Sequence, residues 1–205
     1  YRTAHTVGIR LGSTLDDAAG EAFDKGAVML GLPYPGGPHL MKLAEGGDSD
    51  AHDFPLPLRE EKTFDFSFSG IKTSLKYLLK DLKTPIVDMI PNALASIAAS
   101  YQKAICLHLG AQVEKALAAY AETKELHVVG GVAANTDIRK MLCRAAEQHA
   151  VIVRFPMDIR SCTDNGAMIA AAGYFLAKEK PELVNRSFQT RATVDLQNIL
   201  QCGYH

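Results

Sequence analysis

Residues 91 to 120 are the segment that most restricts how this 205-residue chain can fold. The segment is rich in alanine, has no proline after Pro91, and repeats apolar residues at the spacing of a helix. The repeat comprises Leu94, Ile97, Ala98, Tyr101, Ile105, Leu109, Val113 and Leu117. We therefore predict one long helix over this range, and Gly110 is the point at which it could break.

Shorter helices and strands alternate on both sides of this segment. Helical periodicity predicts further helices over about 16–30, 39–44, 71–82, 135–149 and 163–177. Apolar and β-branched runs predict strands over about 7–12, 126–129 and 151–155, and an extended segment over 64–70. The polar stretch 45–61 contains Gly46-Gly47 and two prolines, which is typical of a surface loop. The order indicates a mixed α/β fold in which helices predominate.

Composition excludes several classes of protein. The formal net charge is −1, so no overall basic field favours nucleic acid. The four cysteines are scattered and form no Cys-x-x-Cys pair, which argues against a zinc ribbon or a disulfide scaffold and fits a reducing compartment. No apolar run reaches the ~18 residues that a membrane span needs, and we expect no signal peptide. The chain begins with Tyr1, so we expect a fragment or a processed product.

The stretch from Gly12 to Pro38 has the composition of a nucleotide pocket. Asp16 and Asp17 are adjacent carboxylates that suit the first turn of the 16–30 helix, and Asp24 follows Asp17 by seven residues on the same face. Carboxylates can bind sugar hydroxyls or a metal ion, and the Gly36-Gly37 pair would let backbone approach a ligand. Alternatively, Asp24 lies on a solvated helix surface, and the Gly36-Gly37 pair only forms a turn.

Two further segments could contact a ligand. Gly130-Gly131 ends a strand and Asn135 begins the next helix, an arrangement whose free N–H groups suit a phosphate. For this motif alone, an ordinary strand-to-helix turn is the favoured interpretation. Asp164 begins the 163–177 helix and is either a helix cap, which we favour from the residues alone, or a ligand for a cation.

Five motifs occur in one order along the chain: GSTLDDAAGEAFDK (12–25), YPGGP (34–38), FSFSGIKT (66–73), VGGVAAN (129–135) and CTDNGAMIA (162–170). In their sequences and their order these motifs resemble those of the tRNA threonylcarbamoyladenosine transferase family, whose members were long described as O-sialoglycoprotein endopeptidases or glycoproteases. The resemblance covers about residues 11–172. The sequences of these motifs are of the bacterial type and favour a cytoplasmic bacterial protein. A mitochondrial or plastid homologue is the alternative.

The resemblance implies a lobe of the actin-like, sugar-kinase and chaperone-ATPase superfamily: an α/β fold, helix-rich with a small mixed sheet. Residues 1–205 would form the second, C-terminal nucleotide-binding lobe. The first lobe of the family carries a His-x-x-x-His metal motif, and the seven histidines of this chain include no pair four residues apart. We therefore expect the chain alone to lack a complete metal site and to be catalytically inactive.

The resemblance also implies an activity and a ligand. Family members transfer a threonylcarbamoyl group from threonylcarbamoyl-adenylate to the N6 amine of the adenosine beside the anticodon of tRNAs that read A-starting codons. The implied partners are tRNA and accessory subunits, with no membrane. The expected ligands are the adenylate, or ATP or AMP, and one divalent metal ion, iron or zinc, whose other ligands lie outside this chain.

Residue by residue, the resemblance implies that Asp24 binds the ribose hydroxyls and that Gly37 brings backbone against the nucleoside. Asn135 would hold the nucleotide beside the Gly130-Gly131 turn, and Asp164 would be a metal ligand. No catalytic side chain is implied, because an acyl–phosphate anhydride already has a good leaving group and needs mainly positioning and charge stabilisation. A cation held by Asp164 could polarise the carbonyl and phosphate oxygens of this anhydride.

Two other functions compete with this interpretation. A metalloprotease would need a general base such as Glu21, but the chain has no His-Glu-x-x-His motif. A non-catalytic scaffold of the same fold would have no need for Asp24, Gly37, Asn135 and Asp164. Cys162 is expected to be a packed thiol rather than a nucleophile. The basic cluster Arg139, Lys140, Arg144, Arg154 and Arg160 could contact tRNA phosphates, or could be a solvated helix face.

Overall fold

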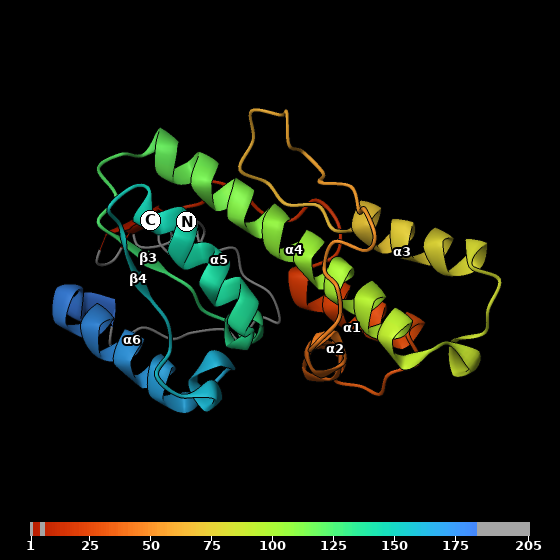
Figure 1. Ribbon diagram of the computed structural model, residues 1–205. Helices are drawn as coiled ribbons and strands as arrows, with labels where there is room; N and C mark the ends of the chain where they lie inside the picture. The colour runs from red at the N-terminus through yellow and green to blue at the C-terminus, as the bar shows by residue number, and fades with distance from the viewer. Residues whose placement is uncertain (1, 5–6, 184–205) are drawn as a thin grey trace. The chain divides into compact units, whose positions relative to one another are not determined.

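The fold is a helix-rich α/β arrangement, and α4 is the longest helix that the structure describes (Figure 1). The structure is a computed structural model that describes residues 2–4 and 7–183. The chain divides into two units, one made of Tyr1–Gly12 with Thr163–His205 and the other of Ser13–Cys162.

The smaller unit contains an antiparallel strand pair and one long helix. β1 (Arg2–Ala4) pairs with β2 (Val7–Ile9), with Arg2 opposite Ile9. The helix is α6 (Gly166–Glu179), and a short 3₁₀ turn, η4 (Pro181–Leu183), follows it.

The larger unit holds the remaining elements. Its helices are α1 (Ala19–Met29), α2 (Gly36–Ala44), α3 (Ser69–Asp81), α4 (Pro91–Ala119) and α5 (Thr136–Glu147). Its strands are β3 (Glu125–His127) and β4 (Ile152–Arg154). Its 3₁₀ turns are η1 (Ile86–Asp88), η2 (Gly131–Ala134) and η3 (Ile159–Cys162).

The long helix predicted from the apolar repeat is confirmed, and it runs through Gly110 without a break. Gly110 is needed for packing instead. A Cβ at this position would lie 2.7 Å from Cγ of Met141 on α5, which is closer than real Cβ contacts. The missing side chain therefore lets α5 approach the second half of α4.

Helices α1 and α2 pack on the first half of α4 and form the main core with it and α3. Phe23, Leu40, Ile71, Tyr101 and Ile105 are all nearly or fully buried there. The ring of Tyr101 is inaccessible to solvent, and its hydroxyl donates to the carbonyl of Ala22 at 2.8 Å. A buried hydroxyl with a partner avoids the cost of desolvation and ties α4 to α1.

Strands β3 and β4 are parallel, with Glu125 opposite Ile152, and α5 connects them as a β-α-β unit. A second small core of Leu117, Ala146 and Val151 lies beneath this unit. The small mixed sheet expected from the family is not seen in the described residues, where the strands form two separate pairs, one antiparallel and one parallel. The helix-rich α/β content with a small parallel sheet is confirmed.

Several predicted boundaries were wrong. α1 begins at Ala19 rather than residue 16, α2 at Gly36 rather than 39, and α6 at Gly166 rather than 163. The extended segment 64–70 contributes one parallel bridge between Thr14 and Phe66. The 45–61 loop is confirmed, because no helix or strand falls within it.

Within residues 2–4 and 7–183, no helix combines the length and the apolar character that crossing a lipid bilayer requires.

Candidate nucleotide site

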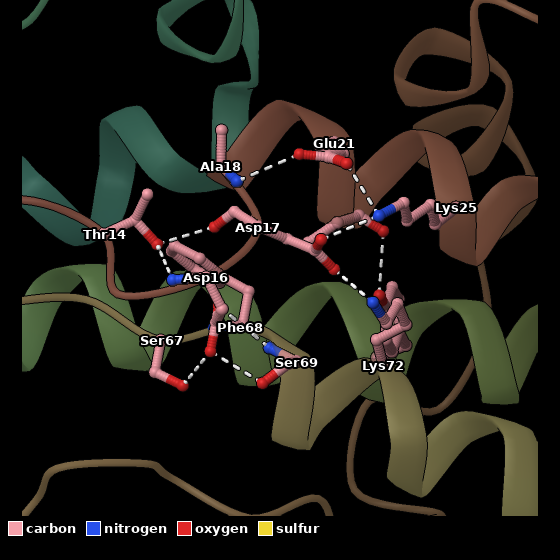
Figure 2. Close-up of polar contacts among 12 residues, drawn as sticks. Thr14, Asp16, Asp17, Ala18, Glu21, Lys25, Ser67, Phe68, Ser69 and Lys72 are labelled. Carbon is pink, nitrogen blue, oxygen red and sulfur yellow. Dashed lines mark hydrogen bonds and ion pairs between the residues drawn. The ribbon is translucent and has the colours of Figure 1, made fainter.

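Asp16 caps the N-terminus of α3 from a loop more than fifty residues away in sequence (Figure 2). Its Oδ1 accepts from the backbone N–H groups of Phe68 at 2.7 Å and Ser69 at 3.2 Å. Its Oδ2 accepts from the hydroxyls of Ser67 and Ser69, each at 2.6 Å. Burial raises the pKa of Asp16, but the hydrogen bonds from both serines and both N–H groups outweigh it and leave the pKa at about 2.

Asp17 lies between two lysines that come from different helices (Figure 2). Lys25 of α1 donates to its Oδ1 at 2.7 Å, and Lys72 of α3 donates to Oδ2. These two hydrogen bonds lower the pKa of Asp17. Lys25 also contacts Glu21 at 2.6 Å, which leaves Glu21 in an ion pair rather than poised as the base of a protease.

The acidic pair therefore joins the loop before α1 to α1 and α3. Both carboxylates already accept hydrogen bonds from the protein, so the expectation that they lie on the first turn of a helix, ready for a sugar or metal, was wrong. Asp17 precedes α1 and does not share a helix face with Asp24. The sequence did contain the signal, because Ser67, Ser69 and Lys72 belong to the FSFSGIKT motif, but their partner lies too far along the chain to be identified from it.

Replacing Asp16 by Asn should lower the free energy of unfolding by about 1 kcal/mol at pH 7, a value discounted because the side chain is exposed. The folded-state pKa lies below the unfolded value of 3.8, so this stabilisation is present above pH 3.8 and is lost as the pH falls towards 2. Urea unfolding of wild type and variant at pH 7 and pH 2 should show the difference shrink. Asp81→Asn, at the opposite end of α3, should be neutral or slightly stabilising; a loss equal to that of Asp16→Asn would contradict the cap.

Asp24 of α1 caps the N-terminus of α2. Its Oδ1 accepts from the N–H of Gly36 at 2.7 Å and of Gly37 at 3.2 Å, and the residue is half-buried. No hydrogen bond to Oδ2 is formed by any residue that the structure describes. A Cβ on Gly36 would lie 2.8 Å from Cα of Asp24, whereas one on Gly37 would lie 4.0 Å from Cβ of Phe23. The structure thus brings Asp24 and Gly37 together, with one carboxylate oxygen not used by the protein.

The Gly130-Gly131 turn joins β3 to α5 and packs against the start of α1. Gly130 has a φ of +90°, which favours glycine, and a Cβ on either glycine would meet nothing within 4 Å. A Cβ on Gly20 would lie 3.4 Å from Cγ2 of Val132, at the place where η2 approaches α1. The exposed glycine backbone leaves room for a ligand on this side of the turn.

Asn135 is buried and caps α5. Its Oδ1 accepts from the N–H groups of Asp137 at 2.9 Å and Ile138 at 3.1 Å, and its Nδ2 donates to Gln102 at 3.1 Å. Gln102 in turn donates to Asp137 at 2.7 Å. The side chain therefore acts as a helix cap, as in the alternative of an ordinary strand-to-helix turn, and its nucleotide-holding role stays a prediction.

Asp164 lies in the smaller unit and is exposed. The cap of α6 is its neighbour Asn165, whose side chain accepts from the N–H of Met168 at 3.0 Å, so the cap role favoured for Asp164 was wrong. Across the residues that the structure describes, no three His, Cys, Asp or Glu side chains gather as a metal site would require. One carboxylate alone does not complete a metal centre, so the metal-ligand role of Asp164 stays a prediction.

Four of the five basic residues in the predicted cluster interact within the protein. Arg139 donates to the Ala133 carbonyl at 2.6 Å, and Lys140 pairs with Asp137 at 3.0 Å. The remaining ion pairs are Arg154 with Glu125 at 2.9 Å and Arg160 with Asp158 at 2.8 Å. These contacts favour the solvated-surface alternative over a tRNA footprint. Cys162 is buried with its thiol 3.9 Å from the Asp158 carbonyl, which confirms a packed thiol.

Comparison with known proteins identifies one family. The profile of tRNA N6-adenosine threonylcarbamoyltransferase matches residues 4–171. The protein of that name from Polaromonas naphthalenivorans is 49% identical to this chain over 79% of its length. The one from Tropheryma whipplei is 48% identical over 81% of this chain. The protein of that name from Thermosipho melanesiensis is 46% identical over 81% of this chain. The matches cover 44%, 42% and 48% of those proteins, so the chain spans about half the length of the curated relatives it matches.

Proposed function

The chain belongs to the tRNA N6-adenosine threonylcarbamoyltransferase family, and on this premise we propose that it supplies the nucleotide-binding part of such an enzyme. The enzyme transfers a threonylcarbamoyl group from threonylcarbamoyl-adenylate to the N6 amine of the adenosine beside the anticodon of tRNAs that read A-starting codons. The observation that carries this proposal is the geometry of Asp24 beside Gly36 and Gly37.

Asp24 is suited to hold a ribose. Its Oδ1 is fixed by the N–H groups of Gly36 and Gly37, so the carboxylate is oriented before a ligand arrives. Its Oδ2 can accept from the 2′- and 3′-hydroxyls of the adenylate, and a charged acceptor makes the stronger kind of hydrogen bond. The absence of a side chain at Gly37, with the nearest atom 4.0 Å from a Cβ built there, leaves space for the nucleoside to approach the backbone.

The chemistry needs positioning more than a nucleophile. The N6 amine attacks the carbamoyl carbon, a C–N bond forms, the C–O bond to the phosphate breaks, AMP leaves, and the amine proton passes to solvent. The leaving group is already good, so holding the adenylate and the base in reach accounts for much of the catalysis. We propose that the open Gly130-Gly131 turn faces the phosphate of the adenylate, near the N-terminus of α5.

The remaining parts of the proposal concern the superfamily, the metal ion, the partners and the compartment. We place the chain in the actin-like, sugar-kinase and chaperone-ATPase superfamily as a C-terminal lobe, which its helix-rich α/β content supports. We propose Asp164 as one ligand of an iron or zinc ion, with the other ligands outside the described residues. tRNA and accessory subunits are the proposed partners, and the bacterial cytoplasm is the proposed compartment.

Asp24→Asn tests this function directly. The amide oxygen of Asn can still accept from Gly36 and Gly37, but the negative acceptor for the ribose is lost, so AMP should bind the chain at least about tenfold more weakly. Isothermal titration with AMP measures the affinity, and urea unfolding should differ by less than about 1 kcal/mol. Asp53→Asn, an exposed carboxylate in the 45–61 loop, is the matched control and should leave AMP binding unchanged.

Activity is tested in a chimera that carries residues 4–171 of this chain in place of the matching part of the Polaromonas naphthalenivorans relative. The chimera should modify tRNA, and its Asp24→Asn form should lose most of that activity. Equal activity with and without the Asp24 carboxylate would contradict the enzyme and leave the scaffold alternative.

A further inference from the structure

Lysines follow one side of α3. Lys72, Lys76 and Lys80 succeed one another at intervals of four residues, and Lys83 comes two residues after the helix ends. Residues four apart lie on the same side of a helix, about 6 Å from one another along its axis. Asp81 is the only acid of α3, and it lies about 100° around the helix from Lys80. This side of α3 therefore carries charge of one sign.

Lys76, Lys80 and Lys83 are exposed and form what we term the lysine row. None of the three makes an ion pair with any residue in the part of the chain that the structure describes. Lys103 of α4 and Lys140 of α5, in contrast, each pair with an aspartate. The described residues thus leave the charge of the row without a counter-charge.

Helix stability does not account for the whole row. Lys80 and Lys83 lie at the C-terminal end of α3, where cations interact favourably with the helix dipole. Lys76 lies one turn earlier, and like charges four residues apart on a helix repel each other. Three unpaired ammonium groups in so short a stretch therefore favour a polyanion as the partner of this surface.

An exposed aromatic ring accompanies the lysine row. Tyr77 follows Lys76 in the chain, and the residue is 59% exposed. Unpaired bases of RNA loops stack on exposed aromatic rings, while neighbouring cations contact the phosphates. An acidic protein would use the cations but would offer no base to the ring. The combination therefore favours RNA over an acidic protein.

Helix α3 holds these side chains on a fixed support. Ile71 and Leu75, on its other side, are inaccessible to solvent, and Asp16 caps its N-terminus. A surface that is ordered before its partner arrives loses less conformational freedom on binding. The lysine row and Tyr77 are therefore suited to position a partner as well as to attract it.

The first lysine of α3 connects this surface to the candidate nucleotide site. Lys72 and Lys25 share the carboxylate of Asp17, and Lys25 is the neighbour of Asp24 in α1 (Figure 2). The helix that carries the lysine row is thus joined by an ion-pair network to the helix that carries the proposed ribose ligand.

We propose that the lysine row binds backbone phosphates of tRNA and that Tyr77 stacks on an unpaired base beside them. The assignment rests on the proposed function, which makes tRNA the acceptor of the transferred group, and it adds the surface on which the tRNA lies. Each lysine meets a phosphate and releases the counterions of that phosphate, so binding depends steeply on salt.

Fluorescence anisotropy of the full chain with a labelled tRNA that reads an A-starting codon tests this surface. The triple variant Lys76→Gln, Lys80→Gln and Lys83→Gln should bind the tRNA at least about tenfold more weakly than wild type. The slope of log K against log salt concentration should fall by about 2 to 3, since each lysine accounts for roughly one unit. The midpoint of urea unfolding should stay that of wild type.

A second triple variant, Lys42→Gln, Lys62→Gln and Lys124→Gln, is the matched control. It removes the same charge from exposed positions outside α3, so its loss of affinity should stay below about threefold. Equal losses in the two triple variants would show that only the net charge matters and would overturn the proposal. Absence of tRNA binding by wild type at low salt would also overturn it.

Two variants of Tyr77 test the base contact. Tyr77→Ala should weaken tRNA binding about tenfold without changing the salt slope, because stacking releases no counterions. Tyr77→Phe keeps the ring and should stay within about twofold of wild type. Binding by Tyr77→Ala equal to that of wild type would overturn the base contact.

Titration with AMP separates this proposal from the proposed function. The lysine row does not include Asp24, so its triple variant should bind AMP as wild type does. A chain that binds AMP, and whose triple variant keeps full affinity for tRNA, would overturn the tRNA surface and leave the nucleotide function in place. A chain that binds tRNA through the row but binds no AMP would contradict the nucleotide function and leave the surface in place.

Discussion

Alanine at position 36 should cost about 3 kcal/mol of folding free energy, because α1 and α2 cross at a point with no room for a methyl group. A Cβ on Gly36 would lie 2.5 Å from Cβ of Ala27 and 2.8 Å from Cα of Asp24, so α2 would have to move away from α1. The movement would also lengthen the hydrogen bond from the Gly36 N–H to Asp24, which is 2.7 Å long. Urea unfolding followed by circular dichroism measures the loss.

Gly37→Ala is the matched control. Position 37 is the next residue of the same helix, and a Cβ there would lie 4.0 Å from its nearest neighbour, Cβ of Phe23. The free energy of unfolding should change by less than about 1 kcal/mol. If Gly37 lies against the nucleoside, however, the added methyl group should weaken AMP binding without weakening the fold. Equal losses of stability at positions 36 and 37 would contradict the close crossing of α1 and α2.

The second large effect is expected at Gly26, where α1 meets α4. A Cβ there would lie 2.3 Å from Cε1 and 2.8 Å from Cζ of Tyr101. The ring cannot move aside easily, since it is fully buried, donates to Ala22 at 2.8 Å and packs edge-on against Phe54 at 5.6 Å between centroids. Gly26→Ala should therefore lower the free energy of unfolding by about 2 to 3 kcal/mol, even after the gain in helix propensity.

Gly20→Ala in the same helix separates the clash from helix propensity. Its nearest neighbour, Cγ2 of Val132, would lie 3.4 Å from the new Cβ, which is an ordinary contact. This variant should be as stable as wild type or up to about 1 kcal/mol more stable. In Gly26→Ala, a further Tyr101→Leu change should cost much less than it does in wild type, because the clash is then gone. Additive losses would show that Tyr101 is not the obstacle.

The Gly36-Gly37 pair also shows how far a motif can be interpreted. Gly36 and Gly37 look equivalent in the sequence, and the notion of backbone approaching a ligand applies to both. In the structure Gly36 is required by the packing of two helices, and only Gly37 leaves space on its open side. The distinction depends on Ala27 and Asp24, whose positions follow from the packing of α1 and not from the motif.

Charged residues were the least predictable part of the site. Asp16, in a stretch of acids before a helix, was expected to stabilise that helix, but it caps α3 through residues that follow it by more than fifty positions. Asn135 and Asn165, in contrast, cap helices through their own neighbours, and a start of each helix near these residues could be predicted. A cap that acts locally can be inferred from spacing, while one that acts across the fold cannot.

The sequence by itself determined the family, the long helix over residues 91–119 and the helix-rich α/β content, because periodicity and motif order are local properties of a chain. Only the tertiary structure decided which carboxylate is engaged and which retains an oxygen for a ligand. Asp16, Asp17 and Asp24 have the same chemistry, but their roles diverge. Folding surrounds Asp16 with serines from α3 and its approach and places Asp17 between lysines from α1 and α3, while Asp24 meets only the start of α2.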